Sequence, residues 1–418
     1  MVSDAMRRLA IHGGPMVRPT PWTPRRLFDE AEKRAVCGLF DAAMASGEAF
    51  GYDGAPEQAY CRAFAAYMGG GFADAVSSGS AAVYVALRAL AIEPFTEVIV
   101  PPVTDMGGVM PVPVCSCIPV VADTAPRSYL VGPEQIADRI TERTSAIIVA
   151  HIAGLACDMD PIMDMARARG IPVIEDCAQA HGATYKGRPV GAFGDVAAFS
   201  TMSGKHHATG AQGGVVYTQR EDLYWKSRRA SDRGKPFGLE GEDTNVVCTL
   251  NFNSNDLACS IGLVQLQKLP AILEGRRKAA RALAECCETL ETVRVDLGLP
   301  DSDGAFWFLV FELDTDKVSC GVAAFAAALE AEGMPFFARY TQPFTRHRWY
   351  RERAVFGSSG YPWSCPLYKG DPDRKYPLPN MDDAHTRLFG LRVHENLTDA
   401  DVEDAFAALC KVEAAYLK

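Results

Sequence analysis

Several features that would place this chain in a specialised class are missing from its sequence. No apolar run reaches the roughly 18 residues that a membrane-spanning helix needs, so no membrane association is expected. No long run of Lys or Arg occurs and the formal net charge is -10 at pH 7, which argues against nucleic acid as a partner. Repeats and low-complexity tracts are also absent. The remaining composition, 48% hydrophobic and 22% charged, is that of a globular protein.

The cysteines form neither a disulfide framework nor a metal-binding pattern. There are 13, an odd number, scattered through the chain. Neither the pair Cys115 and Cys117 nor the adjacent Cys286 and Cys287 has a further ligand at metal-site spacing, so no metal is expected. The N-terminal MVSDAMRRLAIHGG lacks the apolar core of a secretion signal. We therefore expect free thiols in a reducing compartment, the cytoplasm.

The first half of the chain alternates between two hydrophobic periodicities. With 418 residues, the chain exceeds the usual size of a single core, so two domains are expected. Strands are predicted at Glu97–Val100, within Val114–Val121, at Ala146–His151 and at Pro172–Glu175, with helices between them at Ala81–Ala91, Pro133–Ile140 and Pro161–Arg169. Apolar strands separated by helices predict an α/β fold in which helices cover both faces of a mainly parallel sheet.

The pattern changes in the second half. A long amphipathic helix begins after Asp256 and should kink or break at Pro270. It is followed by a predicted strand at Phe306–Leu313, a helix at Val322–Glu332 and a last helix at Asp399–Tyr416. We therefore predict a large domain at residues 1–270, which includes the N-terminal segment, and a smaller C-terminal α/β domain at 271–418.

Ligands in such sheets bind outside the carboxyl ends of the strands, so the residues there are candidates for chemistry. Residues 77–82, Ser-Ser-Gly-Ser-Ala-Ala, precede a helix whose N-terminus could hold an anion, although a turn that only caps the helix has the same composition. Glu175 and Asp176 follow a buried strand, where a carboxylate could keep a pyridinium nitrogen protonated or could cap the next element.

Two later segments are also candidates. Lys205 lies in a stretch of small and apolar residues, where desolvation would lower the pKa of its amine and favour imine formation, although most lysines are simply solvated. The neighbouring His206 and His207 should diverge and lack a third metal ligand. The polar run from Asn251 to Asp256 is typical of a turn and a helix cap.

Taken together, the order and spacing of these segments resemble a known family. The motifs are Ser-Gly-Ser, then E-D-C-A-Q-A-H-G, then F-S-x-x-x-x-K with a Gly-rich tail, then N-x-N-S-N-D before the helix that ends Q-L-Q-K-L. They look like those of the DegT/DnrJ/EryC1/StrS family of sugar and cyclitol aminotransferases. The resemblance implies fold type I of the enzymes that use pyridoxal 5′-phosphate (PLP). It also implies transfer of an amino group from glutamate or glutamine to a keto-sugar, often nucleotide-linked, or to a keto-cyclitol.

The resemblance also implies roles for individual residues. Lys205 matches the Schiff-base lysine that also moves the proton, and Asp176 matches the acid beside the pyridine nitrogen. Gln179 matches the residue near the ring hydroxyl. Asn251 matches an asparagine that reaches the phosphate from the neighbouring subunit, which implies a homodimer with shared active sites. The phosphate itself would be held by Gly79, Ser80 and Ser200.

Three positions depart from the family pattern, all on the substrate side. Asn253 stands where the family has an arginine, and Asp105 stands where an aromatic residue often stacks on the ring. The strand-end motif H-x-Y-G becomes His151-Ile152-Ala153-Gly154. Asp105 and Asn253 are therefore candidate substrate residues, and so is His206 beside the lysine.

Two questions stay open at the level of sequence. A substrate carboxylate or phosphate still needs a cation, and the loop-like run from Arg228 to Lys235 offers Arg229 and Arg233 as substitutes for the missing arginine. A PLP-dependent dehydratase or lyase is the alternative function. Family members that dehydrate carry histidine in place of the lysine, and His206 is adjacent to it. Other PLP chemistry, or loss of catalysis, is a third reading.

Overall fold

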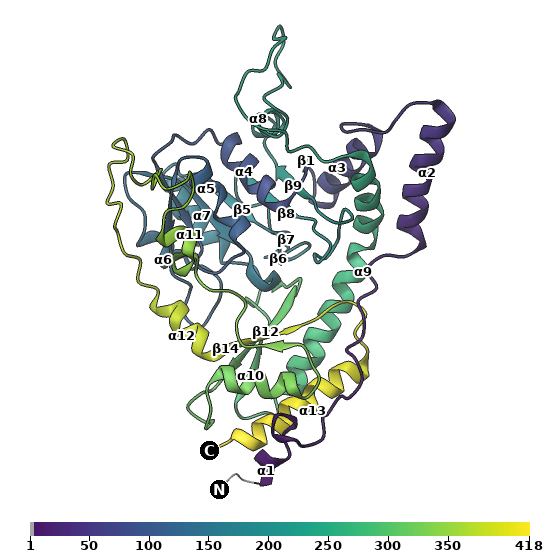
Figure 1. Ribbon diagram of the computed structural model, residues 1–418, viewed down its shortest axis with the longest axis vertical. Coiled ribbons are helices and arrows are strands. Elements are labelled where there is room, and N and C mark those ends of the chain that lie inside the picture. The colour runs from purple at the N-terminus through teal and green to yellow at the C-terminus, as the bar shows by residue number, and fades with distance from the viewer. Residues whose placement is uncertain (1–3) are drawn as a thin grey trace.

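The computed structural model describes residues 4–418 and is built around a seven-stranded sheet (Figure 1). β2, β3, β4, β5 and β8 pair in parallel, whereas β9 runs antiparallel to its neighbours β8 and β1. The mainly parallel sheet expected from the sequence is therefore confirmed. In sheet order the strands are β1 (Phe72–Val76), β9 (Gly214–Thr218), β8 (Val196–Ser200), β5 (Val173–Asp176), β4 (Thr144–Ala150), β2 (Glu97–Val100) and β3 (Ile118–Val121).

Both faces of this sheet are buried, as the apolar strands predict. In β4, Ile148 and Ala150 join one hydrophobic core, and Ile147 and Val149 join the other. The first core contains α4, and the second contains α3, α7 and the first half of α9. The helices of this part of the chain are α2 (Glu30–Ser46), α3 (Ala55–Tyr67), α4 (Gly79–Ala89), α5 (Pro111–Val114), α6 (Pro133–Ala137), α7 (Met159–Ala168), α8 (Glu221–Ser231) and α9 (Asp256–Cys287), with short 3-10 turns η2 (Met106–Gly108) and η3 (Ile152–Gly154).

The C-terminal part has its own antiparallel sheet of four strands, in the order β10-β12-β14-β13, which α9, α10 and α12 contact, and α13 packs on α9 and α10. This confirms the smaller α/β unit. Its elements are β10 (Val293–Asp296), β12 (Phe308–Leu313), α10 (Val322–Ala331), β13 (Phe336–Phe337), η4 (Phe344–Arg346), α11 (Arg348–Arg351), α12 (Pro379–Arg387), β14 (Leu388–Arg392) and α13 (Asp399–Tyr416). A third small sheet joins β6 (Thr184–Tyr185), β7 (Arg188–Pro189) and β11 (Ser302–Asp303).

The predicted break at Pro270 is wrong, because α9 continues through it. The proline lacks the N–H that would bond the carbonyl of Leu266, but Leu266, Leu269 and Leu273 are buried on either side of it and hold the helix together. Figure 1 shows α9 passing from the large sheet to the smaller one. The domain boundary at residue 270, which falls inside this helix, stays a prediction.

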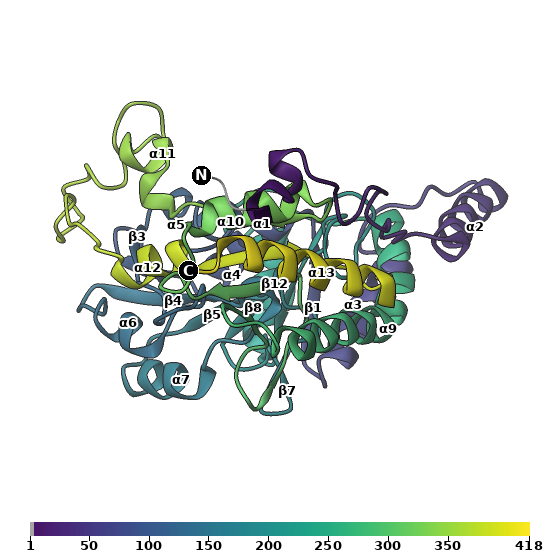
Figure 2. The ribbon, with the colours of Figure 1, turned by 90° about the horizontal axis from the view of Figure 1, so that it is seen from below.

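The N-terminal segment, with α1 (Asp4–Arg7) and η1 (Ala10–His12), packs on the C-terminal unit. The backbone N–H groups of Ala10 and Val17 donate to the Glu332 carboxylate at 2.9 and 3.0 Å, and Arg18 pairs with Asp401 at 2.7 Å. The view from below shows α1 beside α10 and α13 (Figure 2). Residues distant in sequence therefore meet on the second sheet.

Smaller differences concern the ends of elements. The helix predicted at Ala81–Ala91 begins at Gly79, because Ser78 caps it by accepting a hydrogen bond from the Ala81 N–H at 3.1 Å. The predicted helix from Pro133 ends at Ala137. Thr398 caps α13 by accepting a hydrogen bond from the Asp401 N–H at 3.2 Å. No helix in residues 4–418 is both long and apolar enough to cross a membrane.

Candidate active site

The carboxyl ends of four strands open onto one cavity of about 290 Å³. β2, β4, β5 and β8 end there, and the loops that follow them supply most of its walls. This is the edge at which ligands of parallel sheets bind. Of the residues selected from the sequence, the cavity is lined by Gly79, Ser80, Asp105, Asp176, Gln179, Ser200 and Lys205. Trp307 and Tyr340, from the C-terminal unit, complete the wall.

The N-terminus of α4 forms one end of the cavity. A Cβ atom on Gly79 would lie 2.6 Å from the Cβ of Ser200, so only glycine lets the helix approach the end of β8 this closely. Ser80 is packed in the same way, because a Cβ on Gly107 would lie 2.3 Å from its hydroxyl oxygen. Free N–H groups, the helix dipole and two serine hydroxyls together make a small anion-binding site.

Asp176 is the last residue of β5 and its carboxylate faces the cavity. One oxygen accepts a hydrogen bond from the Ala178 N–H at 3.0 Å, and a Cβ on Gly108 would lie 2.7 Å from the other. Burial raises the pKa of Asp176, although the Ala178 N–H and the nearby Lys205 oppose this. A buried carboxylate of this kind gains most from a cation placed beside it.

Lys205 faces the same cavity from the loop after β8. Its Nζ lies 4.2 Å from the centroid of the Trp307 ring. Burial lowers the pKa of Lys205, while the charges of Asp176 and Asp105 work in the opposite direction. Because desolvation favours the neutral form, the amine is suited to attack a carbonyl carbon.

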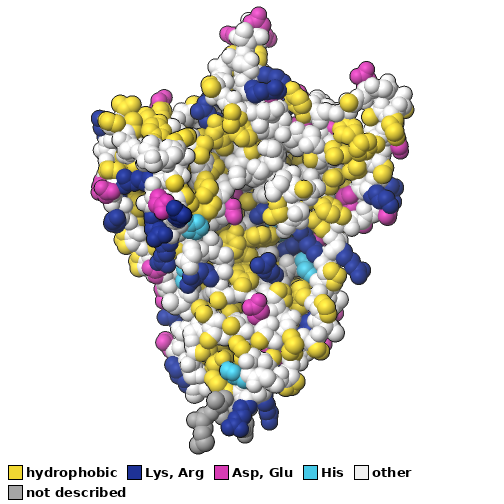
Figure 3. Space-filling view, viewed as in Figure 1, with side chains coloured by type: hydrophobic (Ala, Val, Ile, Leu, Met, Phe, Trp, Pro, Cys, Tyr) yellow, Lys and Arg dark blue, Asp and Glu magenta, His cyan; other side chains and the backbone are white. Residues whose placement is uncertain are grey.

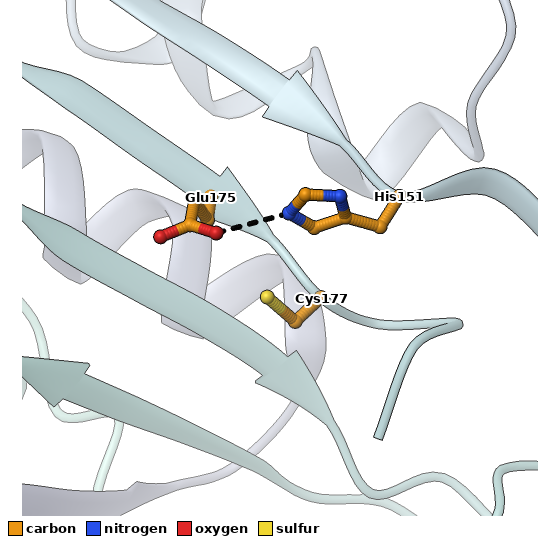
Figure 4. A group of neighbouring side chains, drawn as sticks. All are labelled: His151, Glu175 and Cys177. Carbon is orange, nitrogen blue, oxygen red and sulfur yellow. Dashed lines mark hydrogen bonds and ion pairs between the residues drawn. The ribbon is translucent and has the colours of Figure 1, made fainter. Parts of the chain in front are cut away.

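His151, which lines the cavity, forms a buried pair with Glu175 (Figure 4), with His151 Nε2 3.0 Å from a Glu175 oxygen. His151 Nδ1 accepts from the Cys157 N–H, so Nε2 carries the proton and donates it to Glu175. Burial would raise the pKa of Glu175, but His151 and the backbone N–H groups of Gly191 and Gly194 lower it. The carboxylate therefore stays ionised.

The same arrangement makes a metal site unsuitable here, although the ligand atoms of His151, Glu175 and Cys177 all lie within 4.8 Å of one another. The histidine nitrogen that faces Glu175 bears a proton and has no lone pair to offer. Burial raises the pKa of the Cys177 thiol well above its usual range, so it stays protonated. The group supports the ends of β4 and β5.

Comparison with known proteins identifies the chain. The profile of the DegT/DnrJ/EryC1/StrS aminotransferase family matches residues 38–410. The chain belongs to this family. It is 31% identical to the L-glutamine:2-deoxy-scyllo-inosose aminotransferase of Streptomyces lividus over 97% of both chains, and 37% identical to the GDP-perosamine synthase of Caulobacter vibrioides over 52% of this chain and 58% of that protein. An aminotransferase structure from Psychrobacter cryohalolentis superposes with a TM-score of 0.81, at 27% identity, over 94% of this chain and 99% of that one.

The protein is therefore an aminotransferase that uses PLP, and the chemistry of the cavity fits this cofactor. The N-terminus of α4 suits the phosphate of PLP, because it offers backbone N–H groups and the positive end of the helix dipole. Glycine at position 79 is what allows α4 to lie this close to Ser200. The buried Asp176 carboxylate suits its ring nitrogen, and the desolvated Lys205 amine suits its aldehyde. A metal is not needed to hold any of these three groups.

The aminotransferase holds Gln179 from two sides. Its Oε1 accepts from the Ala153 N–H and its Nε2 donates to the Tyr340 hydroxyl, each at 2.8 Å. Ala153, at the position where the family motif has tyrosine, has a left-handed backbone with φ of 62°. The tyrosine hydroxyl that contacts Gln179 comes from Tyr340, in a distant part of the chain. Sequence reasoning missed Tyr340 and Trp307, because neither lies in a motif.

The remaining candidates of the aminotransferase lie outside this cavity. His206 is fully buried, with Nε2 3.0 Å from the Ala305 carbonyl oxygen, whereas His207 bonds the Tyr60 hydroxyl at 2.8 Å. Burial lowers the pKa of both rings well below the usual range, so both are neutral. The two side chains diverge, as expected.

The polar candidates near residues 229–253 form a separate cluster. Arg229 donates to the Phe237 carbonyl, and Arg233 pairs with Asp232 at 2.8 Å. The Asn251 Oδ1 accepts from the Asn253 N–H at 3.0 Å. Burial acts to raise the pKa of Asp232. Hydrogen bonds from Lys235, Arg233 and Asn253 outweigh burial and lower this pKa. The positive charge of Arg233 is thus compensated within its own chain.

Replacing Gly79 with alanine should weaken cofactor binding. The added methyl group would collide with Ser200, and overpacking of this kind costs roughly 1–3 kcal/mol, or about thirtyfold in affinity at the middle of that range. The dissociation constant of PLP, measured by titrating the cofactor-free protein, checks this. Gly321→Ala, before α10, is the control, because its Cβ would have no atom within 4 Å. Equal affinities of the two variants would contradict the packing argument.

The pKa of Lys205 should fall further when Asp105 is replaced by asparagine. Burial already lowers this pKa from 10.5, and the Asp105 charge counteracts burial by stabilising the ammonium form. Since the neutral amine is the reactive form, the rate of cofactor capture should rise with pH in the unmodified protein, with a midpoint below 10.5. In Asp105→Asn, the midpoint should move to lower pH. Stopped-flow absorbance across pH measures it, and a midpoint that stays or rises would show that Asp105 does not act on the lysine.

Proposed function

We propose that this aminotransferase moves an amino group from glutamate or glutamine to a keto-sugar or keto-cyclitol in a biosynthetic pathway. The observation that carries the proposal is the meeting of Lys205, Asp176 and the α4 anion site in one cavity. The similar protein from Streptomyces lividus is named as an L-glutamine-dependent aminotransferase of a cyclitol ketone, and the Caulobacter one as a GDP-perosamine synthase. Both names support this substrate range.

Each residue of the cavity then has a distinct task. PLP, when bound, supplies an electron sink for the carbon that loses or gains the proton. Lys205 would hold the cofactor through its Nζ and would carry that proton. Asp176 would keep the ring nitrogen protonated by charge pairing. Gln179, which Ala153 and Tyr340 orient, would lie near the ring hydroxyl. Gly79, Ser80 and Ser200 would hold the phosphate.

The position of His206 supports amino transfer over dehydration. A dehydratase of this family would present histidine in place of the lysine. The His206 ring lies outside the cavity and bonds a backbone carbonyl, and its pKa is lowered well below the usual range by burial. Lys205 alone of the two faces the site. Dehydration would therefore lack the histidine that it needs in the cavity.

Further roles depend on assembly and on substrate. We infer a homodimer in which Asn251 reaches the partner's phosphate site, because within its own chain Asn251 is outside the cavity. Asn253, Arg229 and Arg233 would then meet substrate across the same interface, and Asp105 would meet it from within the cavity. All thirteen cysteines are free thiols, which suits a cytoplasmic enzyme.

Lys205→Ala should abolish turnover while leaving the fold intact, because no other amine lines the cavity in the described part of the chain. The purified variant should lose the visible absorbance band of lysine-bound cofactor. Addition of glutamate or glutamine should change that band in the unmodified protein. The variant, which lacks the band, should show no such change. The control is Lys278→Ala, an exposed lysine that pairs with Asp399 outside the cavity. Normal amino transfer by Lys205→Ala would remove this lysine from the mechanism.

Shared active sites predict complementation between two inactive proteins. Lys205→Ala and Asn251→Ala should each be inactive as homodimers, whereas a mixture should regain up to about a quarter of the activity, since random exchange leaves one intact site in half of the dimers. Activity after mixing and subunit exchange is the measurement. Asn245→Ala, in the same loop, should stay active on its own. A fully active monomer in sedimentation experiments would contradict the model of shared sites.

A further inference from the structure

The amine of Lys205 has few direct partners in the cavity. Lys205 is only 7% exposed, and within residues 4–418 its Nζ makes no hydrogen bond or ion pair. Asp176 and Asp105 act on it only through their charges. A buried ammonium group of this kind needs further stabilisation whenever the amine carries its extra proton.

The indole ring of Trp307 supplies such stabilisation. Nζ lies 4.2 Å from the ring centroid, inside the roughly 6 Å over which an aromatic face attracts a cation. Among the aromatic side chains tryptophan attracts cations most strongly, and the attraction grows when water is excluded. Figure 3 shows hydrophobic side chains gathered in the hollow above β12, the strand that begins directly after Trp307. A ring in these surroundings can hold an ammonium group that water reaches poorly.

The same side chain also fixes the loop that carries Lys205. Residues 201–213 join β8 to β9 without a helix or a strand. The Trp307 Nε1–H donates to the Gly204 carbonyl at 3.1 Å, directly beside Lys205. Trp307 is itself anchored, because its backbone N–H donates to the Ala153 carbonyl at 2.8 Å. One residue of the C-terminal unit therefore sets both the position of the loop and the surroundings of the amine.

Apart from the two aspartates, the titratable groups around Lys205 in the described chain add no charge of their own. The Tyr340 ring meets that of Trp307 edge-on at 5.7 Å, and burial raises the pKa of its hydroxyl, which stays protonated. Burial lowers the pKa of His181 to about 4, so this ring is neutral. His151 has both ring nitrogens bonded to other groups. The indole face is therefore the contact that can favour the ammonium form at short range.

We propose that Trp307 is a positioning residue for the lysine: its ring holds the Lys205 amine in the ammonium form, and its indole N–H fixes the loop from which the amine acts. The inference rests on the proposed role of Lys205 as the carrier of the proton. A proton carrier has to be accessible in both of its forms. Burial favours the free amine, and the ring, by attracting the ammonium group, keeps the charged form accessible as well.

The test measures the rate at which the cofactor-free protein captures PLP, by stopped-flow absorbance across pH. Trp307→Leu keeps the site apolar but removes the ring, so the midpoint of the rate should move to lower pH by roughly half a unit to one and a half units. Trp307→Phe keeps an aromatic face and loses only the hydrogen bond to Gly204, so its midpoint should stay nearer that of the parent. Trp225→Leu, at a half-buried tryptophan of α8 outside the cavity, should leave the midpoint unchanged.

A second measurement changes the ring without changing its shape. Replacing the five tryptophans of the chain by a fluorinated analogue weakens the negative face of each ring. The midpoint should fall when the parent protein is labelled in this way and should not change when Trp307→Phe is labelled. Because no side chain is shortened, this comparison still decides the question if Trp307→Leu does not fold.

Three outcomes would overturn the role of the ring. These are a midpoint that stays or rises in Trp307→Leu, an unchanged midpoint in the fluorinated parent, and equal falls in Trp307→Leu and Trp307→Phe. Failure of the proposed role of Lys205 is distinguishable, since Lys205→Ala would then capture PLP with the same dependence on pH as the parent, whatever the tryptophan variants show.

Discussion

β5 ends in two consecutive carboxylates, Glu175 and Asp176, and the site depends on their pointing to opposite sides of the sheet. Neighbouring residues of a strand point to opposite sides, so Glu175 lies in the interior while Asp176 faces the cavity. Glu175 is fully buried yet ionised because His151 and backbone N–H groups pay for its desolvation. Those partners belong to the loops after β4 and before β8. One buried charge thus fixes three segments around Asp176.

The electrostatics of the cavity follow from this framework. Asp176 is held where burial favours its neutral form, and Lys205 is held where burial favours the free amine. Burial destabilises each group as an ion, and the charge of each partly offsets the effect of burial on the other. A cofactor that brings a cationic ring nitrogen to Asp176 and an aldehyde to Lys205 relieves both penalties.

The C-terminal unit completes the site and does not merely cover it. The Ala305 and Trp307 N–H groups donate to the Gly154 and Ala153 carbonyls, each at 2.8 Å, which ties the entry to β12 to the loop after β4. Trp307 is thereby placed beside Lys205, and Tyr340 reaches Gln179. The wall of the cofactor cavity therefore belongs to both units. Relative movement of the units would change the shape of this cavity.

The sequence by itself determined the parallel sheet, the cofactor and the segments around Asp176 and Lys205. These follow from local signals, since strand periodicity, a glycine-rich turn and short motifs lie within a few residues of one another. It could not place Trp307 or Tyr340, which the packing of the second sheet brings to the site from 100 or more residues away. The sequence also could not tell how two adjacent side chains would point: Lys205 faces the cavity, whereas His206 points into the core. Only the tertiary structure decides such cases, because they depend on which surfaces meet and not on the order of residues.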